Sequence, residues 1–212
     1  MSLAPQALAA LDTGQLIALA AALGWASGVR LYAVVFLTSL AGAMGWVALP
    51  SGLQMLQHPL VLGASGLMLV VEFLADKVPG LDSLWDGLHT LVRIPAGAAL
   101  AAAVFGGDDL AWATIAGLAG GSLAATSHVA KTTARVAINT SPEPFSNIAM
   151  SLASDAAVPL MLWLALHHPL WFAAALSLAV VAGLVLTVLL WKFLKTLVRG
   201  LRARLGGAGA PA

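Results

Sequence analysis

Charged and polar side chains recur at helical spacing in the middle of this chain. Asp82, Asp86, His89 and Arg93 lie at offsets of 0, 4, 7 and 11 residues. At about 100° per residue, these positions fall on one narrow face of a helix. This face could bind an ion or relay a proton, because histidine titrates near physiological pH. A structural role is the alternative: Ser83 to Asp86 has the pattern of a capping box, and His89 and Arg93 could pair with the acids.

A second stripe contains His128, Lys131, Arg135 and Asn139, at offsets of 0, 3, 7 and 11. The other faces of this segment carry apolar or small side chains, so the stripe must face protein or water. Lys131 and Arg135 then need anionic partners, which we predict come from the first half of the chain. The candidate acids in that half are Glu72, Asp76, Asp82 and Asp86, and Asp155 is a further candidate from the second half.

Asn147, Ser151 and Asp155 repeat at a spacing of four residues and form a third stripe. Two prolines in the stretch before it stop the preceding helix, so the connection 139–147 should be tight and ordered. Its free backbone N–H groups could meet an anion. A rigid turn between two helices explains the same residues.

The clustered charges are nearly balanced, with six acids and five bases. Near balance is typical of a buried network whose members pair with one another. Arg30 belongs to this set as the single charge between Gly14 and Leu49. The acids are Glu72, Asp76, Asp82, Asp86, Glu143 and Asp155, and the bases are Arg30, Lys77, Arg93, Lys131 and Arg135.

The composition identifies the medium around these charges. Of 212 residues, 60% are hydrophobic and only 9% are charged, and the mean hydropathy is +0.95. A soluble domain carries about 25% charged residues, so this is an all-α integral membrane protein. A charge at membrane depth is costly and persists only when it is paired or in use. The chain has no cysteine, which excludes disulfides and thiol chemistry, and its net charge of +1 gives no indication of a nucleic-acid partner.

The apolar runs predict about six transmembrane helices in a single polytopic domain, residues 1–205. A spanning helix needs about 20 apolar residues. The first run, from Gly14 to Leu49, is too long for one span. It is a tilted helix or two half-helices broken near Gly24, Ser27 and Gly28. The predicted spans are Leu16–Leu40, Leu60–Ala75, Leu91–Phe105, Trp112–Ile138, Ile148–Leu166 and Leu170–Leu190.

A weak internal similarity suggests two related halves, residues 14–105 and 112–191. In each half a base follows a run of small residues, at Arg30 and at Lys131. Each half would hold three spans, so the second would be inverted relative to the first, as in many transporters. Small residues are also common wherever membrane helices pack, which explains the same pattern without a repeat.

The distribution of bases predicts the orientation. The tail, residues 192–212, holds five Lys or Arg residues, whereas the connections at 45–59, 106–111 and 167–169 hold none. Lysine and arginine favour the cytoplasmic side. With six spans, both termini are expected on the cytoplasmic face of a bacterial inner membrane. The tail should lie along that surface as a basic amphipathic helix.

Several strings resemble an uncharacterised bacterial integral membrane family called domain of unknown function 4126. They are Glu72-Phe-Leu-Ala-Asp-Lys-Val-Pro, Asp82-Ser-Leu-Trp-Asp, His89-Thr-Leu-Val-Arg-Ile-Pro-Ala-Gly, Asn139-Thr-Ser-Pro-Glu-Pro-Phe-Ser-Asn and, earlier, Ser27-Gly-Val-Arg-Leu-Tyr. The resemblance covers about Gly14 to His168. It implies a membrane location and no established activity, so function must be inferred from chemistry.

The chemistry favours a transporter or channel for a small charged solute, with the three stripes facing one polar cavity. No resident cofactor is expected; a proton or a divalent cation such as Mn, Mg or Zn could be the substrate. The metal candidates are Glu72, Asp76, Asp86, His89 and Asp155. All the expected binding residues are Arg30, Glu72, Asp76, Asp82, Asp86, His89, Arg93, His128, Lys131, Arg135, Asn139, Asn147, Ser151 and Asp155.

Two other classes remain open. An acid, histidine and arginine set at the cytoplasmic face could act on a lipid or lipid-linked phosphate head group. Against this enzyme alternative, the chain has no nucleophile elbow, metalloprotease motif or phosphate loop. A structural protein whose network only holds its helices together is the other alternative. The expected partners are the lipid bilayer, the solute and, in an assembly, further copies of the chain.

Overall fold

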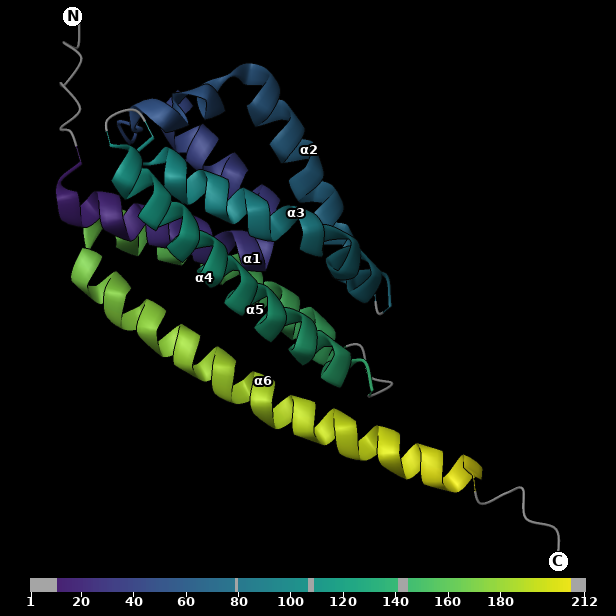
Figure 1. Cartoon of the computed structure of the whole chain (residues 1–212). Coiled ribbons are helices and arrows are strands. Elements are labelled where there is room, and N and C mark those ends of the chain that lie inside the picture. The colour runs from purple at the N-terminus through teal and green to yellow at the C-terminus, as the bar shows by residue number, and fades with distance from the viewer. Residues whose placement is uncertain (1–10, 79, 107–108, 141–144, 207–212) are drawn as a thin grey trace, which may run out of the picture.

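The computed structural model describes residues 11–78, 80–106, 109–140 and 145–206. All regular secondary structure in these residues is helical, which confirms the all-α prediction (Figure 1). The elements are α1 (Thr13–Ala43), the 3-10 helix η1 (Ser51–Gln57), α2 (Pro59–Ala75), α3 (Leu81–Ala103), α4 (Leu110–Ile138), α5 (Phe145–His167) and α6 (Pro169–Gly206).

The first helix is broken in the middle and folds back. Arg30 leaves helical geometry, with φ −149° and ψ 89°. Leu19 and Ala41 line one pocket, although 22 residues of straight helix would separate them by about 33 Å. Both ends of α1 therefore lie at the same end of the bundle (Figure 1). The alternative of two half-helices is the one found, with the break two residues beyond Gly28.

Glycine permits the close contact that holds the broken helix against α4. A Cβ added at Gly24 would lie 2.5 Å from the Cα of Gly120, and one added at Gly28 would lie 2.1 Å from the carbonyl oxygen of Ala124. Small residues at such crossings are typical of membrane helix pairs. The first half of α1 is thereby placed deep between its neighbours.

The remaining helices run back and forth between two ends of the bundle. The α2–α3 and α4–α5 connections lie at one end, toward which α6 also runs (Figure 1). We call this the charged end, for reasons given below. Both ends of α1, η1 and the α5–α6 connection lie at the other, which we call the apolar end (Figure 1).

Four helices, α1, α4, α5 and α6, are long and apolar enough to cross a membrane, and the bent pair of η1 and α2 makes a fifth. This is fewer than the six spans predicted. The helix not included is α3, whose 23 residues are long enough but carry the first polar stripe. The predicted third span began at Leu91, whereas α3 begins at Leu81, so the whole stripe lies on one helix.

The structure shows no internal repeat in the residues it describes. In the predicted halves α1 and α4 would correspond, yet α1 breaks at Arg30 and α4 is continuous over 29 residues. The basic tail also differs from expectation. It continues α6, a helix of 38 residues, and forms no separate surface helix up to Gly206.

The two described ends of the chain lie at opposite ends of the bundle (Figure 1). Thr13 starts at the apolar end and α6 finishes at the charged end. The expectation that both termini share one face assumed six crossings. The break of α1 at Arg30 means that its 31 residues do not form one straight crossing.

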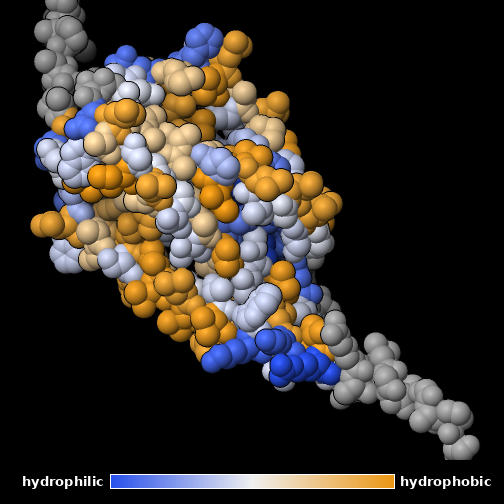
Figure 2. Space-filling view, viewed as in Figure 1, coloured by the Kyte–Doolittle hydropathy of each residue, from blue (hydrophilic) through white to orange (hydrophobic). Residues whose placement is uncertain are grey.

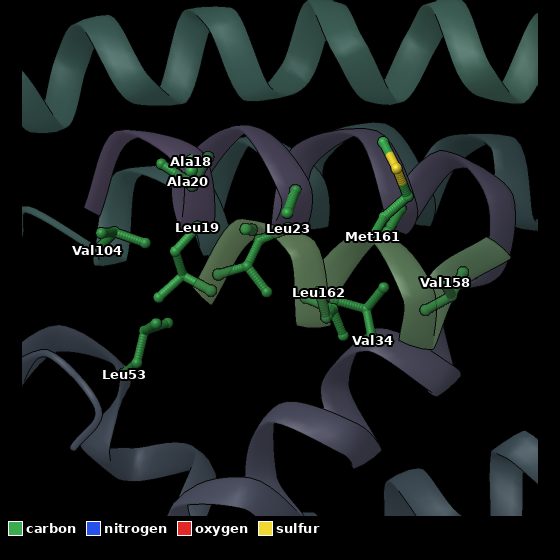
Figure 3. Packing of buried hydrophobic residues seen from close by; sticks show 14 of the residues in the cluster. Ala18, Leu19, Ala20, Leu23, Val34, Leu53, Val104, Val158, Met161 and Leu162 are labelled. Carbon is green, nitrogen blue, oxygen red and sulfur yellow. The ribbon is translucent and has the colours of Figure 1, made fainter. Parts of the chain in front are cut away.

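The apolar end contains the hydrophobic core. Leu19, Leu23, Val34, Leu53 and Leu162 pack there among small side chains (Figure 3). On the outside, large apolar side chains are exposed, with Leu91 and Leu170 at 84% and 86%. Figure 2 shows hydrophobic side chains along α6 and hydrophilic ones near its described C-terminal part. Such an exterior suits contact with lipid.

Candidate functional site

The three polar stripes meet at the charged end, in one connected network of ion pairs. Among the described residues it contains five acids and five bases, so it is formally neutral. Helices α1 to α5 all contribute. Its members are Arg30, Glu72, Asp76, Lys77, Asp82, Asp86, Arg93, Lys131, Arg135 and Asp155.

Asp76 is the first of two carboxylates at the centre of this network. It caps the C-terminus of α2, and its Oδ2 atom lies 2.9 Å from Arg30, 3.3 Å from Lys131 and 3.1 Å from Arg135. One carboxylate oxygen is thus shared by three cations from α1 and α4. Such sharing ties the break in α1 directly to α2 and α4.

Asp86 is the second central carboxylate. Its oxygens lie 2.5 Å from Arg93, 3.1 Å from Lys131 and 3.5 Å from Arg135. Asp86 therefore pairs within the network and does not serve as a helix-start device. Asp82, in the first turn of α3, is the acid that contacts the helix start: its Oδ1 accepts hydrogen bonds from the backbone N–H groups of residues 80 and 83 at 2.8 and 2.6 Å.

Each buried arginine has, besides these shared acids, a further carboxylate that it shares with no other buried arginine; we call these carboxylates the rim of the network. Lys131 has none: its further bond, at 3.0 Å, goes to the carbonyl oxygen of Val29. The prediction that Lys131 and Arg135 pair with acids from the first half of the chain is confirmed. The rim pairs are Arg93 with Glu72 at 2.5 Å, Arg135 with Asp82 at 2.9 Å and Arg30 with Asp155 at 2.9 Å.

Almost the whole network is buried. Arg30, Arg93 and Arg135 are fully inaccessible, as are Glu72 and Asp76. Removing one partner of a buried ion pair leaves an uncompensated charge and costs about 3–5 kcal/mol. The network therefore requires its complete set of charges.

The network reaches the molecular surface at Asp155 and Lys77, whose side chains are 23% and 26% exposed. Lys77 Nζ lies 3.7 Å from Asp155 Oδ2 and 3.0 Å above the ring of Phe73. Partial burial lowers the pKa of Lys77, and the charge of Arg30 lowers it further, while Asp155 opposes the shift. This pair is the most accessible part of the site.

The uncharged members of the second and third stripes bind the same network. Asn147 Oδ1 accepts from Arg135 at 3.0 Å, and Ser151 Oγ accepts from Arg30 at 2.9 Å. Asn139 donates to Asp82 at 3.1 Å. The residues that connect Asn139 to α5 include 141–144, which lie outside the described residues, so the predicted roles of that connection and of Glu143 are not addressed by the structure.

His128 lies beside the network. Its Nε2 lies 2.7 Å from the Oγ1 of Thr90, whose hydroxyl also contacts the carbonyl oxygen of Asp86 at 3.0 Å. Its Nδ1 faces Arg93 at 3.5 Å. Thr90 was not predicted, although it lies four residues after Asp86 and hence on the same face.

His89 forms no ion pair with the described members of the network. Its Nδ1 donates to the carbonyl oxygen of Trp85 at 2.9 Å, its Nε2 lies 3.2 Å from the hydroxyl of Tyr32, and its ring stacks on Trp85. Tyr32 was not predicted as a site residue, and only its position two residues after Arg30 could have suggested it.

The predicted metal set does not come together. Within the described parts of the chain, no group of three His, Asp or Glu side chains is arranged to hold a metal ion. The reason is that the carboxylates of Glu72, Asp76, Asp86 and Asp155 each face an arginine or lysine, while His89 lies elsewhere.

Several buried polar atoms of the network have no hydrogen-bond partner among the described residues. They include Glu72 Oε2, Asp76 Oδ1, Arg30 Nη1 and Asn147 Nδ2. Buried polar atoms are rarely left unpaired in proteins, so these atoms have room for a further partner such as a water molecule or an ion. The stripes converge on this packed cluster, and a cavity of about 230 Å³ borders it at Lys131.

The sequence model of one protein family, described as a domain of unknown function (DUF4126), matches residues 17–192. The match covers most of the chain, which therefore belongs to this family. It includes every member of the ion-pair network. No curated protein and no solved structure matched the chain.

Proposed function

We propose that this member of the DUF4126 family is a transporter or channel for a small charged solute. The observation that carries the proposal is the convergence of three polar stripes on one buried network at the break of α1. Lipid can satisfy none of these charges, so the helices that carry them depend on one another or on a bound ion.

The pairing pattern supports a closed state that opens by exchange of charges. A fully paired network is neutral, so a solute ion entering it must replace one member in its pair. The unpaired atoms Glu72 Oε2, Asp76 Oδ1 and Arg30 Nη1 are ready to accept new contacts. Because an uncompensated buried charge costs about 3–5 kcal/mol, opening would be coupled to the arrival of the solute.

The break of α1 supplies a movable element. Arg30, at the break, contacts Asp76 of the α2 end and Asp155 of α5. A shift of α5 that withdraws Asp155 would release Arg30 from one of its two acids. Broken helices that line a central site serve this purpose in many transporters.

We place the charged end on the cytoplasmic face of a bacterial inner membrane. All described Lys and Arg residues except Arg30 lie in the α2–α3 turn, the adjoining parts of α3 and α4, or the end of α6. The N-terminus then lies on the opposite face. With α3 counted, six segments enter the membrane. Cysteine introduced at Trp46 should be labelled from outside intact cells, and cysteine at Gly200 should not; the reverse would overturn this orientation.

The function is tested by reconstitution in liposomes with a panel of protons, metal ions and small anions. We expect flux of at least one solute, and loss of that flux in Asp155→Asn. Asp109→Asn is the matched control, because Asp109 caps α4 far from the network. Absence of flux for the whole panel, in protein shown to be folded, would contradict transport.

One observation favours a second candidate, a purely structural protein. Every charged member of the network has an ion-pair partner, as expected if the charges only fix the helices. A structural network predicts that Asp155→Asn lowers stability without changing any flux. The liposome experiment therefore separates the two candidates.

A further inference from the structure

An open cavity of about 230 Å³ lies between α1, α4 and α5 and is lined on a further side by α6. Trp25 and Val29 line it from α1, Ser154 from α5 and Lys131 from α4. The break of α1 follows Val29, and Asp155 follows Ser154. The cavity is thus adjacent to the parts of the network that the proposed opening would move.

Lys131 is the cation of the network that is most readily redirected. It shares Asp76 with Arg30 and Arg135, and it shares Asp86 with Arg93 and Arg135. It has no carboxylate of its own. If its ammonium group turned toward the cavity, both acids would keep arginine partners, so none would be left buried without a cation.

The walls restrict what this cavity can hold. Ser127 Oγ already donates to the carbonyl oxygen of Trp25 at 2.6 Å, and Ser154 Oγ donates to that of Met150 at 2.9 Å. Lys131 is then the only charged donor among the residues that line the cavity, and most of the other lining side chains are apolar. A metal ion would find no carboxylate or imidazole ligand in this lining. An anion with an apolar body could instead pair with Lys131 and pack against the apolar side chains.

The size of the cavity limits the ligand further. Pockets for drug-sized molecules have volumes of about 300–1,000 Å³. This cavity is smaller, so the apolar body holds a few carbon atoms. A membrane lipid with full-length chains does not fit within it.

We propose that this cavity binds a short-chain organic carboxylate, with the carboxylate on Lys131 and the hydrocarbon part against Trp25 and Val29. The proposal rests on the proposed function in that it names the solute class. Carboxylate and ammonium form a charge-assisted hydrogen bond, which is stronger than a neutral one. Displacement of Lys131 from Asp76 and Asp86 would loosen the network from within.

Binding can be measured by calorimetry on the purified full-length protein in nanodiscs. Hexanoate should bind saturably, while hexylammonium, of similar size and opposite charge, should not bind. Palmitate tests whether the ligand is instead a fatty acid from the bilayer. Binding of palmitate without hexanoate, or of both hexyl ions equally, would overturn the proposal.

Two variants test the location of the site. Lys131→Gln should weaken hexanoate binding about tenfold or more, whereas Lys192→Gln, on the exposed part of α6, should not change it. Ala157→Leu fills the cavity without touching any charge and should abolish binding, with Ala174→Leu on the outer face of α6 as its control. The second pair remains informative if Lys131→Gln fails to fold. Unchanged binding in Ala157→Leu would overturn the proposal.

Failure here and failure of the proposed function are distinguishable. Flux of an inorganic ion in liposomes, without hexanoate binding, would leave transport standing and remove only the carboxylate assignment. Hexanoate binding without flux of any solute would leave the carboxylate site standing and remove the proposal of transport.

Discussion

The two ends of the bundle are built from largely the same helices but are held together in opposite ways. At the apolar end, α1 and α5 meet through side chains such as Leu23, Val34 and Leu162. At the charged end, the same two helices meet through Arg30 and Asp155. The contact between α1 and α5 therefore consists of packed apolar side chains at one end and of an ion pair at the other.

In a membrane, ion pairs contribute more to holding helices together than apolar contacts do, whereas in water the apolar contacts dominate. Lipid tails are as apolar as leucine, so the apolar end gains van der Waals packing but little hydrophobic driving force. Lipid cannot replace an ion-pair partner, so the charged end holds its helices together strongly. We therefore expect single substitutions to lower the stability of the protein most when they remove a member of the ion-pair network.

The largest effect is expected for Arg135→Ala. The change removes contacts to Asp76, Asp82 and Asp86 and leaves these acids short of a cation. Loss of a buried partner costs about 3–5 kcal/mol. Thermal unfolding of the purified protein in detergent should show a marked loss relative to Lys192→Ala. Adding Asp82→Asn to Arg135→Ala should recover part of the stability; equal melting of parent and Arg135→Ala would show that the network contributes little.

Gly28→Ala should come next, because it acts between the two ends. The new Cβ would lie 2.1 Å from the carbonyl oxygen of Ala124, so α1 and α4 must move apart. Overpacking of this kind typically costs about 1–3 kcal/mol. Gly87→Ala is the matched control, since nothing lies within 4 Å of its added Cβ, and alanine there should be neutral or stabilising. Similar unfolding of both variants would argue against the close crossing.

Asp155→Asn should have a smaller effect on stability than Asp76→Asn. Asp155 is partly exposed, and water can solvate Arg30 and Lys77 in its place. We expect a loss of about 1 kcal/mol for Asp155→Asn, close to that of exposed pairs, and several times more for Asp76→Asn. Chemical denaturation of both variants in one detergent gives the comparison. Equal losses would show that the network has no accessible part.

The smallest effect concerns the pH dependence contributed by Lys77. Its pKa is lowered from 10.5 in the folded protein, mainly by burial. The folded state therefore disfavours the charged form, and this penalty is present below the lowered pKa and disappears as pH rises toward 10.5. The stability of the parent relative to Lys77→Met should rise over that window in unfolding experiments. A fall over the same window would mean that pairing with Asp155 outweighs burial.

Spacing along the chain was sufficient to predict which residues meet in the network. The offsets place each of two sets on one helix face: Asp82, Asp86 and Arg93 on one helix, and Lys131 and Arg135 on another. Lipid cannot solvate a charged face, so such faces must contact each other or water. The same reasoning placed the partners of Arg135 in the first half of the chain, but it did not distinguish which of the acids there they would be. These positions were predictable because a charged side chain at membrane depth is stable only where it meets a partner of opposite charge.

Other features depend on information that spacing does not carry. His89 has the right offset, but stacking on Trp85 and contact with Tyr32 draw its ring away. The fold-back at Arg30 involves no proline, and the close approach of α4 to Gly28 beside it joins residues almost 100 positions apart in the sequence. The start of α3 was missed because its charged first half lowers the hydropathy of a segment that is nonetheless one helix.

The position of Arg30 at the break of α1 has a consequence for biosynthesis. The ribosome makes Arg30 before any of its acidic partners: Asp76 follows 46 residues later and Asp155 follows 125 residues later. At about 5–20 residues per second, the second interval lasts roughly 6–25 s. Until Asp76 has been made, Arg30 has none of its acidic partners, and until Asp155 has been made it has only one of the two. The full set of ion pairs around Arg30, at the break of the first helix, can therefore form only after the fifth helix has been made.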